Sequence, residues 1–111
     1  MAGERKDGGR PQWQQEGEVA TRPDDRVRRP RQYRVVLLND DYTTMEFVVM
    51  VLVEIFHHPR QRAIEIMLQV HHQGSGVAGI YPYAIAESKA RRVMQLARSQ
   101  GYPLRCTLEP A

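Results

Sequence analysis

Hydrophobic and polar residues follow two kinds of pattern from Tyr33 onward, and each pattern predicts an element. Residues 33–38 are aromatic, β-branched or aliphatic and stop at Asn39, which predicts a strand followed by a turn. Residues 44–56 carry apolar positions at helical spacing with almost no polar face, so we expect a buried helix there. Thr43 followed by Glu46 has the spacing of a capping box, which predicts that Thr43 caps this helix.

Two further helices are predicted beyond this point. Pro59 suits the first turn of the second helix and Gly74 its end, and its expected inner side is Ala63, Ile64, Met67, Leu68, Val70 and His71. A third helix is expected over residues 83–100, and Gly101 ends it. Its expected buried stripe is Ile85, Ala86, Ala90, Val93, Met94 and Ala97.

The remaining segments complete the expected fold. Residues 76–82 form a short run with two glycines, and residues 104–108 alternate apolar and polar positions, so both are predicted as strands. The order β-α-α-β-α-β predicts an α+β two-layer sandwich, a three-stranded antiparallel sheet packed on three helices. Residues 1–31 are rich in charge, glycine and proline, which predicts a disordered N-terminal extension. Residues 32–111 are then the one folded domain.

Composition narrows the class of protein. The chain has 111 residues, of which 41% are hydrophobic and 26% charged, and its formal net charge is +3. That balance is typical of one soluble domain and too weakly basic to indicate nucleic-acid binding. No apolar run is long enough to span a membrane, and the N-terminal stretch is polar, unlike a secretion signal. With Cys106 alone, no internal disulfide is possible, so we expect a cytoplasmic protein without membrane contact.

Asn39, Asp40 and Asp41 form the most conspicuous polar cluster, between a strand and a helix. They could be a plain turn whose side chains bond nearby backbone N–H groups. They could also form the rim of a binding site, because two carboxylates and an amide carbonyl offer many acceptors, which suits an ammonium group. A divalent metal is a third alternative, although hard cations usually take oxygen ligands from more widely spaced positions.

Histidines and methionines supply the other candidates. The pairs His57–His58 and His71–His72 are neighbours in sequence, so neither makes an i, i+4 metal clamp. His71 lies beside the apolar face of the second helix, where an imidazole can make one directed hydrogen bond. Met45 and Met67 are either core residues or the walls of an adaptable pocket. No catalytic motif is present, so we expect a binding domain with no cofactor and no metal.

Several strings of this sequence resemble the ClpS adaptors of the bacterial ATP-dependent Clp protease. They are NDDYTTMEFV, MLQVHHQG, AESKA and the final PLRCTLEPA, and the likeness extends over residues 33–111. The resemblance implies a non-enzymatic, monomeric adaptor. It would recognise N-degrons, substrates that begin with Leu, Phe, Tyr or Trp, and hand them to the N-domain of the ClpA unfoldase or of a ClpC-type relative.

The resemblance also implies roles for particular residues. Asn39, Asp40 and His71 would surround the substrate's α-amino group, and Asp41 would contact or brace the substrate backbone. Met45 would flank the side-chain pocket and disfavour β-branched first residues. The other pocket positions would be Thr43, Val48, Met67, Val70 and Leu104. Contacts with the unfoldase would fall on Glu87 and Lys89.

Two positions depart from the family pattern. Thr44 stands where proline is common, and a proline at the first helical position would stiffen the start of the helix. Ala84 stands where the family usually has an acidic residue, so docking on the unfoldase is expected to differ. Two rival functions remain at this point. One is a general interaction domain without amino-terminus recognition, and the other is a metal-dependent hydrolase built on Asp40, Asp41 and His71.

Overall fold

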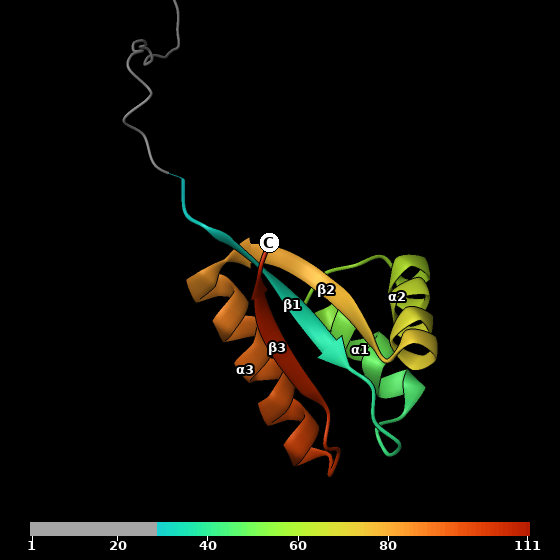
Figure 1. The fold of residues 1–111 in the computed structure, drawn as a ribbon. Coiled ribbons are helices and arrows are strands. Elements are labelled where there is room, and N and C mark those ends of the chain that lie inside the picture. The colour runs from blue at the N-terminus through green and yellow to red at the C-terminus, as the bar shows by residue number, and fades with distance from the viewer. Residues whose placement is uncertain (1–28) are drawn as a thin grey trace, which may run out of the picture.

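The computed structural model describes residues 29–111, and the predicted disordered extension falls mostly on residues 1–28, outside the described part. The order of elements is β-α-α-β-α-β, as predicted (Figure 1). The elements are β1 (Gln32–Leu38), α1 (Met45–Glu54), α2 (Arg60–Gln73), β2 (Ser75–Pro82), α3 (Tyr83–Ser99) and β3 (Arg105–Pro110). None of the helices in this part of the chain is long and apolar enough to cross a membrane.

The three strands form one antiparallel sheet with β1 at its centre. Its order is β2-β1-β3, and Leu37 of β1 lies opposite Gly76 of β2 and Cys106 of β3. The register between β1 and β2 shifts at Val35, where Ala78 is the extra residue of a bulge. Side chains of a strand alternate between the two faces, so Val35 and Leu37 point to the same side, where both are fully buried.

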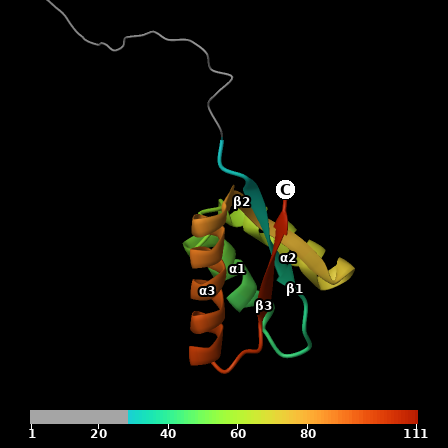
Figure 2. The same ribbon diagram turned by 60° about the vertical axis from the view of Figure 1, so that its left-hand side comes forward.

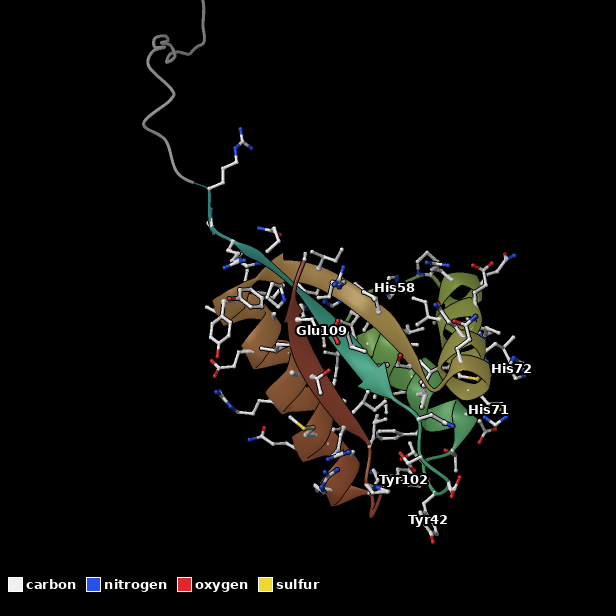
Figure 3. The ribbon with its side chains drawn as sticks, viewed as in Figure 1. Tyr42, His58, His71, His72, Tyr102 and Glu109 are labelled. Atoms are coloured by element: carbon white, nitrogen blue, oxygen red, sulfur yellow. The ribbon has the colours of Figure 1, made fainter. Side chains whose placement is uncertain are left out.

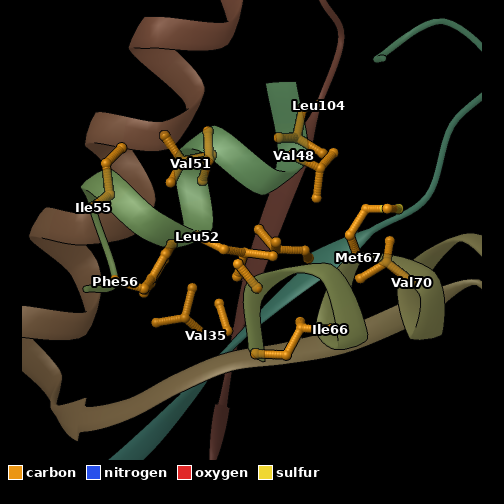
Figure 4. Close-up of a cluster of buried hydrophobic side chains, with 14 of the residues drawn as sticks. Val35, Val48, Val51, Leu52, Ile55, Phe56, Ile66, Met67, Val70 and Leu104 are labelled. Carbon is orange, nitrogen blue, oxygen red and sulfur yellow. The ribbon is translucent and has the colours of Figure 1, made fainter. Parts of the chain in front are cut away.

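The helices cover that buried side of the sheet. Figure 1 shows α3 beside β3, with α1 and α2 together on the other side of β1, and Figure 2 shows α1 and α3 on the same side of the strands. One hydrophobic cluster joins all three helices to β1, including Val35, Leu52, Ile66 and Val93 (Figure 4 shows part of it). The predicted two-layer α+β fold is therefore confirmed.

The start of α1 corrects the sequence analysis. The capping residue is Thr44, whose hydroxyl accepts a hydrogen bond from the N–H of Phe47 at 3.2 Å. The capping box predicted from Thr43 and Glu46 is wrong, because the hydroxyl of Thr43 donates to Asp40 instead. Thr44 also precedes the first helical residue, with φ −72° and ψ 152°, so the departure from proline lies at the cap itself.

The helix ends were predicted well, whereas some faces were not. Gly74, with φ 91°, ends α2, and Gly101, with φ 82°, follows α3, so both expected stops adopt the left-handed conformation that glycine tolerates. Leu68 and Ile85 were expected inside but are 39% and 48% exposed. Ile66 is buried and was missed, because the inward stripe of α2 is Ala63, Ile66, Met67 and Val70.

Candidate functional site

A pocket of about 400 Å³ opens where β1 ends and the chain turns into α1. It is enclosed by the loop, by the first turn of α1 and by the last turns of α2. The residues that line it are Asn39, Asp40, Asp41, Tyr42, Thr43, Thr44, Met45, Val48, Met67, Val70 and His71. Nine of the predicted site residues therefore lie around one cavity.

Asp40 holds the loop in shape. Its Oδ1 accepts hydrogen bonds from the N–H of Tyr42 at 2.8 Å and of Thr43 at 2.7 Å, and its Oδ2 accepts one from the Thr43 hydroxyl at 2.8 Å. Partial burial raises the pKa of this carboxyl, but the bonds from Thr43 and Tyr42 and the charge of Arg98 outweigh it, so the pKa lies below its ordinary value. Asp40 is therefore ionised at neutral pH.

The loop is also tied to the end of α2. The N–H of Asn39 donates to the carbonyl of Gly74 at 2.9 Å, directly after the helical turn that carries His71. Figure 3 shows His71 on this last turn and Tyr42 at the loop tip, at the same end of the molecule. Two segments far apart in sequence thus form one rim. A carboxylate has about four acceptor positions, so Asp40 keeps roughly one, and the Asn39 carbonyl and Asp41 add more.

The inner wall of the pocket is apolar. Val48, Met67 and Val70 are 7%, 8% and 2% exposed, whereas Met45 is 45% exposed and stands at the mouth. Figure 4 shows Val48 from α1 near Met67 and Val70 from α2 at one end of the buried cluster. Val70 is backed by β2, since a Cβ on Gly76 would lie 2.8 Å from its Cγ2 atom. Glycine there allows the strand to approach the helix closely.

Leu104 is the predicted pocket residue that does not line the cavity. It is 1% exposed and belongs to the hydrophobic core. Leu104 directly precedes β3, and Cys106 and Leu108 of that strand pack against the same core. Conversely, Tyr42 and Thr44 line the pocket without having been assigned to it. The sequence signal that could have identified them is their position within the polar turn between Asn39 and Met45.

Glu87 and Lys89 lie on α3, apart from the pocket. The Lys89 ammonium donates to the carbonyl of Ile55 at 2.7 Å and stands 5.2 Å from the centre of the Tyr81 ring. Glu87 faces Arg91 at 3.5 Å, an exposed pair along the helix. Beside them is a smaller hollow of about 290 Å³, lined by Ile55, Ala84, Ile85, Ser88, Lys89 and Arg92.

The remaining titratable candidates do not gather into a second site. His58 contacts the carbonyl of Ala78 at 2.5 Å, and Figure 3 shows it well away from His71 and His72. Within residues 29–111 no three His, Cys, Asp or Glu side chains are placed to share a metal ion. Burial raises the pKa of the Cys106 thiol to about 12, against the opposing charge of Arg98, so this cysteine is not a thiolate at neutral pH.

These features define a small α+β domain with a pocket that is polar at its rim and apolar at its inner wall. The family model described as "ATP-dependent Clp protease adaptor protein ClpS" matches residues 28–107. The chain therefore belongs to the ClpS family, which consists of adaptors of the Clp protease and not of enzymes.

Individual relatives agree with this assignment. The ATP-dependent Clp protease adapter protein ClpS of Desulfatibacillum aliphaticivorans is 49% identical over 94 residues, which cover 85% of this chain and 90% of the relative. The ClpS adapter protein of Nitratidesulfovibrio vulgaris strain DP4 is 56% identical over 86 residues, which cover 78% of this chain and 83% of the relative. Among solved structures, Agrobacterium tumefaciens ClpS2 bound to L-phenylalaninamide is 41% identical, with a TM-score of 0.72 over 75% of this chain and all of that one.

Proposed function

We propose that this adaptor binds proteins by a free N-terminal Leu, Phe, Tyr or Trp and delivers them to a ClpA-type AAA+ unfoldase, or to a ClpC-type relative. The observation that carries the proposal is the pocket itself. Its rim offers acceptors from Asn39, Asp40 and Asp41, while its wall is formed by methionine and valine side chains. A free N-terminal residue combines an ammonium group and a side chain at one carbon atom, so it matches both parts.

The amino-terminal end is recognised by charge and hydrogen bonding. A model α-amino group titrates at about 7.7–8.0, so it carries three N–H donors and a positive charge at neutral pH. Asn39 and Asp40 accept two of these donors, His71 contacts the third from α2, and Asp41 braces the substrate backbone. Each charge-assisted bond contributes about 1.5–3 kcal/mol. The L-phenylalaninamide bound to the Agrobacterium relative has the same pairing of a free α-amino group with a large apolar side chain.

The side chain of the first residue is selected by shape. Val48, Met67 and Val70 form the buried wall, with Thr43 at the loop side and Met45 at the mouth. Burying apolar surface contributes about 25 cal/mol per Å², which favours Leu, Phe, Tyr and Trp over small residues. A β-branched residue would place its second methyl group beside the Met45 side chain at the mouth, which disfavours Ile and Val. Leu104 supports this wall from the core.

Binding titrations with paired peptides test the proposal. One peptide begins with Phe, and its partner is identical except for an acetylated α-amino group. We expect the free peptide to bind at least tenfold more tightly, because acetylation removes the charge and leaves the rim acceptors unpaired. Equal binding of the two peptides would contradict amino-terminus recognition.

Delivery to the unfoldase rests on α3. The Lys89 ammonium is fixed by the Ile55 carbonyl, and Ile85, which lines the same hollow, is 48% exposed, so a charged and an apolar group lie together there. We expect Lys89→Ala to weaken binding to the isolated unfoldase N-domain while leaving peptide binding unchanged. Gln95, exposed further along α3, offers a matched control as Gln95→Ala. Equal loss in both variants would place the docking surface elsewhere.

A further inference from the structure

A second hollow lies next to the amino-terminus pocket, along the trough between α1 and α2. Its volume is about 560 Å³, and it is lined by Met45, Glu46, Val49, Met50, Val53, Glu54, Arg60, Ile64 and Met67. Met45 and Met67 line both cavities. The two hollows are therefore neighbours with a shared methionine boundary, and we call this second one the α1–α2 groove.

The spacing of residues along α2 makes the groove and the pocket continuous. His71, Met67, Ile64 and Arg60 follow one another at intervals of four, three and four positions, so they share one face of the helix. His71 and Met67 line the pocket, whereas Met67, Ile64 and Arg60 line the groove. This row of four side chains thus begins at the polar rim and runs away from it along α2 for about 16 Å.

That direction is the one a bound substrate chain needs. If the amino group is held at the His71 end, as proposed above, a chain that continues along this face of α2 passes Ile64 and Arg60. In an extended chain, residues 1 and 3 point to the same side and are about 6.6 Å apart. On α1, the step from Met45 to Val49 is four residues, or about 6 Å. A substrate whose first side chain enters the pocket, and whose backbone follows this face of α2, would place its third side chain over the groove.

We propose that the α1–α2 groove is a second subsite, which takes an apolar side chain at the third residue of the substrate. This inference rests on the proposed recognition of N-termini. The floor is apolar, since Val49 is 6% exposed and Met50, Val53 and Ile64 are partly buried against the core. Glu46 and Glu54 at the sides outnumber Arg60, so an acidic third residue is disfavoured.

Three peptides that begin with Phe test the subsite by titration. They differ only in having Leu at the second residue, Leu at the third residue, or Gly at both. We expect Leu at the third residue to tighten binding roughly tenfold relative to Gly, and Leu at the second residue to have little effect. Equal gains from both positions would indicate nonspecific apolar contact and would overturn the proposal.

Two variants on α2 locate the effect. Ile64→Gln should abolish the gain from Leu at the third residue without changing the affinity of the all-glycine peptide. Leu68→Gln is the matched control, because Leu68 is 39% exposed on the same helix and does not line the groove. The all-glycine peptide also reports whether each variant is folded. Should Ile64→Gln unfold the domain, Val53→Gln on the facing helix gives the same measurement.

The outcomes separate this inference from the function on which it rests. If the free-amine peptide is preferred over its acetylated form but the third residue has no influence, the pocket stands and the groove subsite is refuted. If acetylation has no effect, the proposed function fails first. The groove could instead be the surface through which two copies of the chain associate. In that case Ile64→Gln would abolish self-association and peptides would show no preference at the third residue, which would also refute the proposal.

Discussion

Replacing Asp40 by asparagine separates its two roles, bracing the loop and attracting the substrate's ammonium group. Asparagine keeps an oxygen that can accept from the N–H groups of Tyr42 and Thr43, and its amide can donate to the Thr43 hydroxyl, so the loop can keep its shape. The negative charge is lost. For the effect on folding, Asp41→Asn is the matched control, because Asp41 is exposed and accepts no hydrogen bond within residues 29–111.

The effect on folding follows from the three hydrogen bonds. A bond to a charged group contributes about 1.5–3 kcal/mol and one between neutral groups about 0.5–1.5 kcal/mol. Because Asp40 is only partly buried, the lower ends apply, and we expect Asp40→Asn to lower the free energy of unfolding by about 1–2 kcal/mol. In a domain of this size, each kcal/mol lowers Tm by about 4–8 °C. Asp41→Asn should change stability by less than about 0.5 kcal/mol.

The pH dependence of this difference has a definite sign. The folded-state pKa of Asp40 lies below its unfolded value of 3.8, so the stabilisation is fully present above pH 3.8. It is lost as pH falls through the lower folded-state pKa. Thermal unfolding of wild type and Asp40→Asn should therefore differ at neutral pH and converge in strong acid. A constant difference at every pH would show that the charge of Asp40 does not stabilise the loop.

Binding supplies the second measurement on the same proteins. Loss of one charge-assisted bond worth about 1.5–3 kcal/mol weakens the free-amine Phe peptide roughly 10- to 150-fold. Binding of the acetylated peptide should be unchanged by Asp40→Asn, because it has no ammonium group. Fluorescence anisotropy with labelled peptides measures both. If Asp40→Asn binds the free-amine peptide as wild type does, this carboxylate is not the counter-charge, and its role is structural alone.

Four further outcomes are expected. Met45→Ala should raise the affinity for peptides that begin with Ile or Val about tenfold relative to Phe, because it widens the mouth of the pocket; unchanged discrimination would remove Met45 as the selecting residue. Thr44→Ala should lose about 0.5–2 kcal/mol of capping, whereas Thr44→Pro, which loses the same hydroxyl, should lose less, because φ −72° suits proline and its restriction of the unfolded chain returns about 0.4–1 kcal/mol. Peptide affinity should fall toward tenfold per pH unit above about pH 8, as the free amine deprotonates; a flat profile to pH 9.5 would contradict a charged ligand. Deleting residues 2–25 should leave peptide binding intact but slow degradation of an N-degron substrate by unfoldase and protease together, and an unchanged rate would assign those residues no part in delivery.

The sequence predicted the order of elements because its strong signals are local. Alternation in the strands, helical spacing in the helices and glycine at Gly74 and Gly101 act over a few residues, and each determined an element or its end. The faces of α2 and α3 were harder to predict. Leu68 and Ile85 are apolar and exposed, and only the placement of the neighbouring elements decides which side of a helix is covered.

Prediction of the site was limited for a similar reason. The polar cluster after β1 was visible as a source of acceptors, yet spacing alone left a turn, a cation site and a metal site open. The structure shows that Asp40 is a brace as well as a candidate acceptor, because Thr43 and Tyr42 bend back onto it. Asn39 and His71 lie at one rim because the N–H of Asn39 bonds to the carbonyl of Gly74, 35 positions further along the chain. No local pattern in the sequence predicts a contact over that separation.

The hydrogen bond from Asn39 to Gly74 has a consequence for the rate of exchange of cargo. It joins the loop to the end of α2, so both sides of the rim are in place before a ligand arrives. A site without a closing step can associate at about 10⁵–10⁷ M⁻¹s⁻¹, and differences in affinity between ligands then lie mainly in how fast they leave. We therefore expect the residence time to be set by the contacts that the first and third side chains of the cargo make, because no part of this rim has to open before the cargo is passed on.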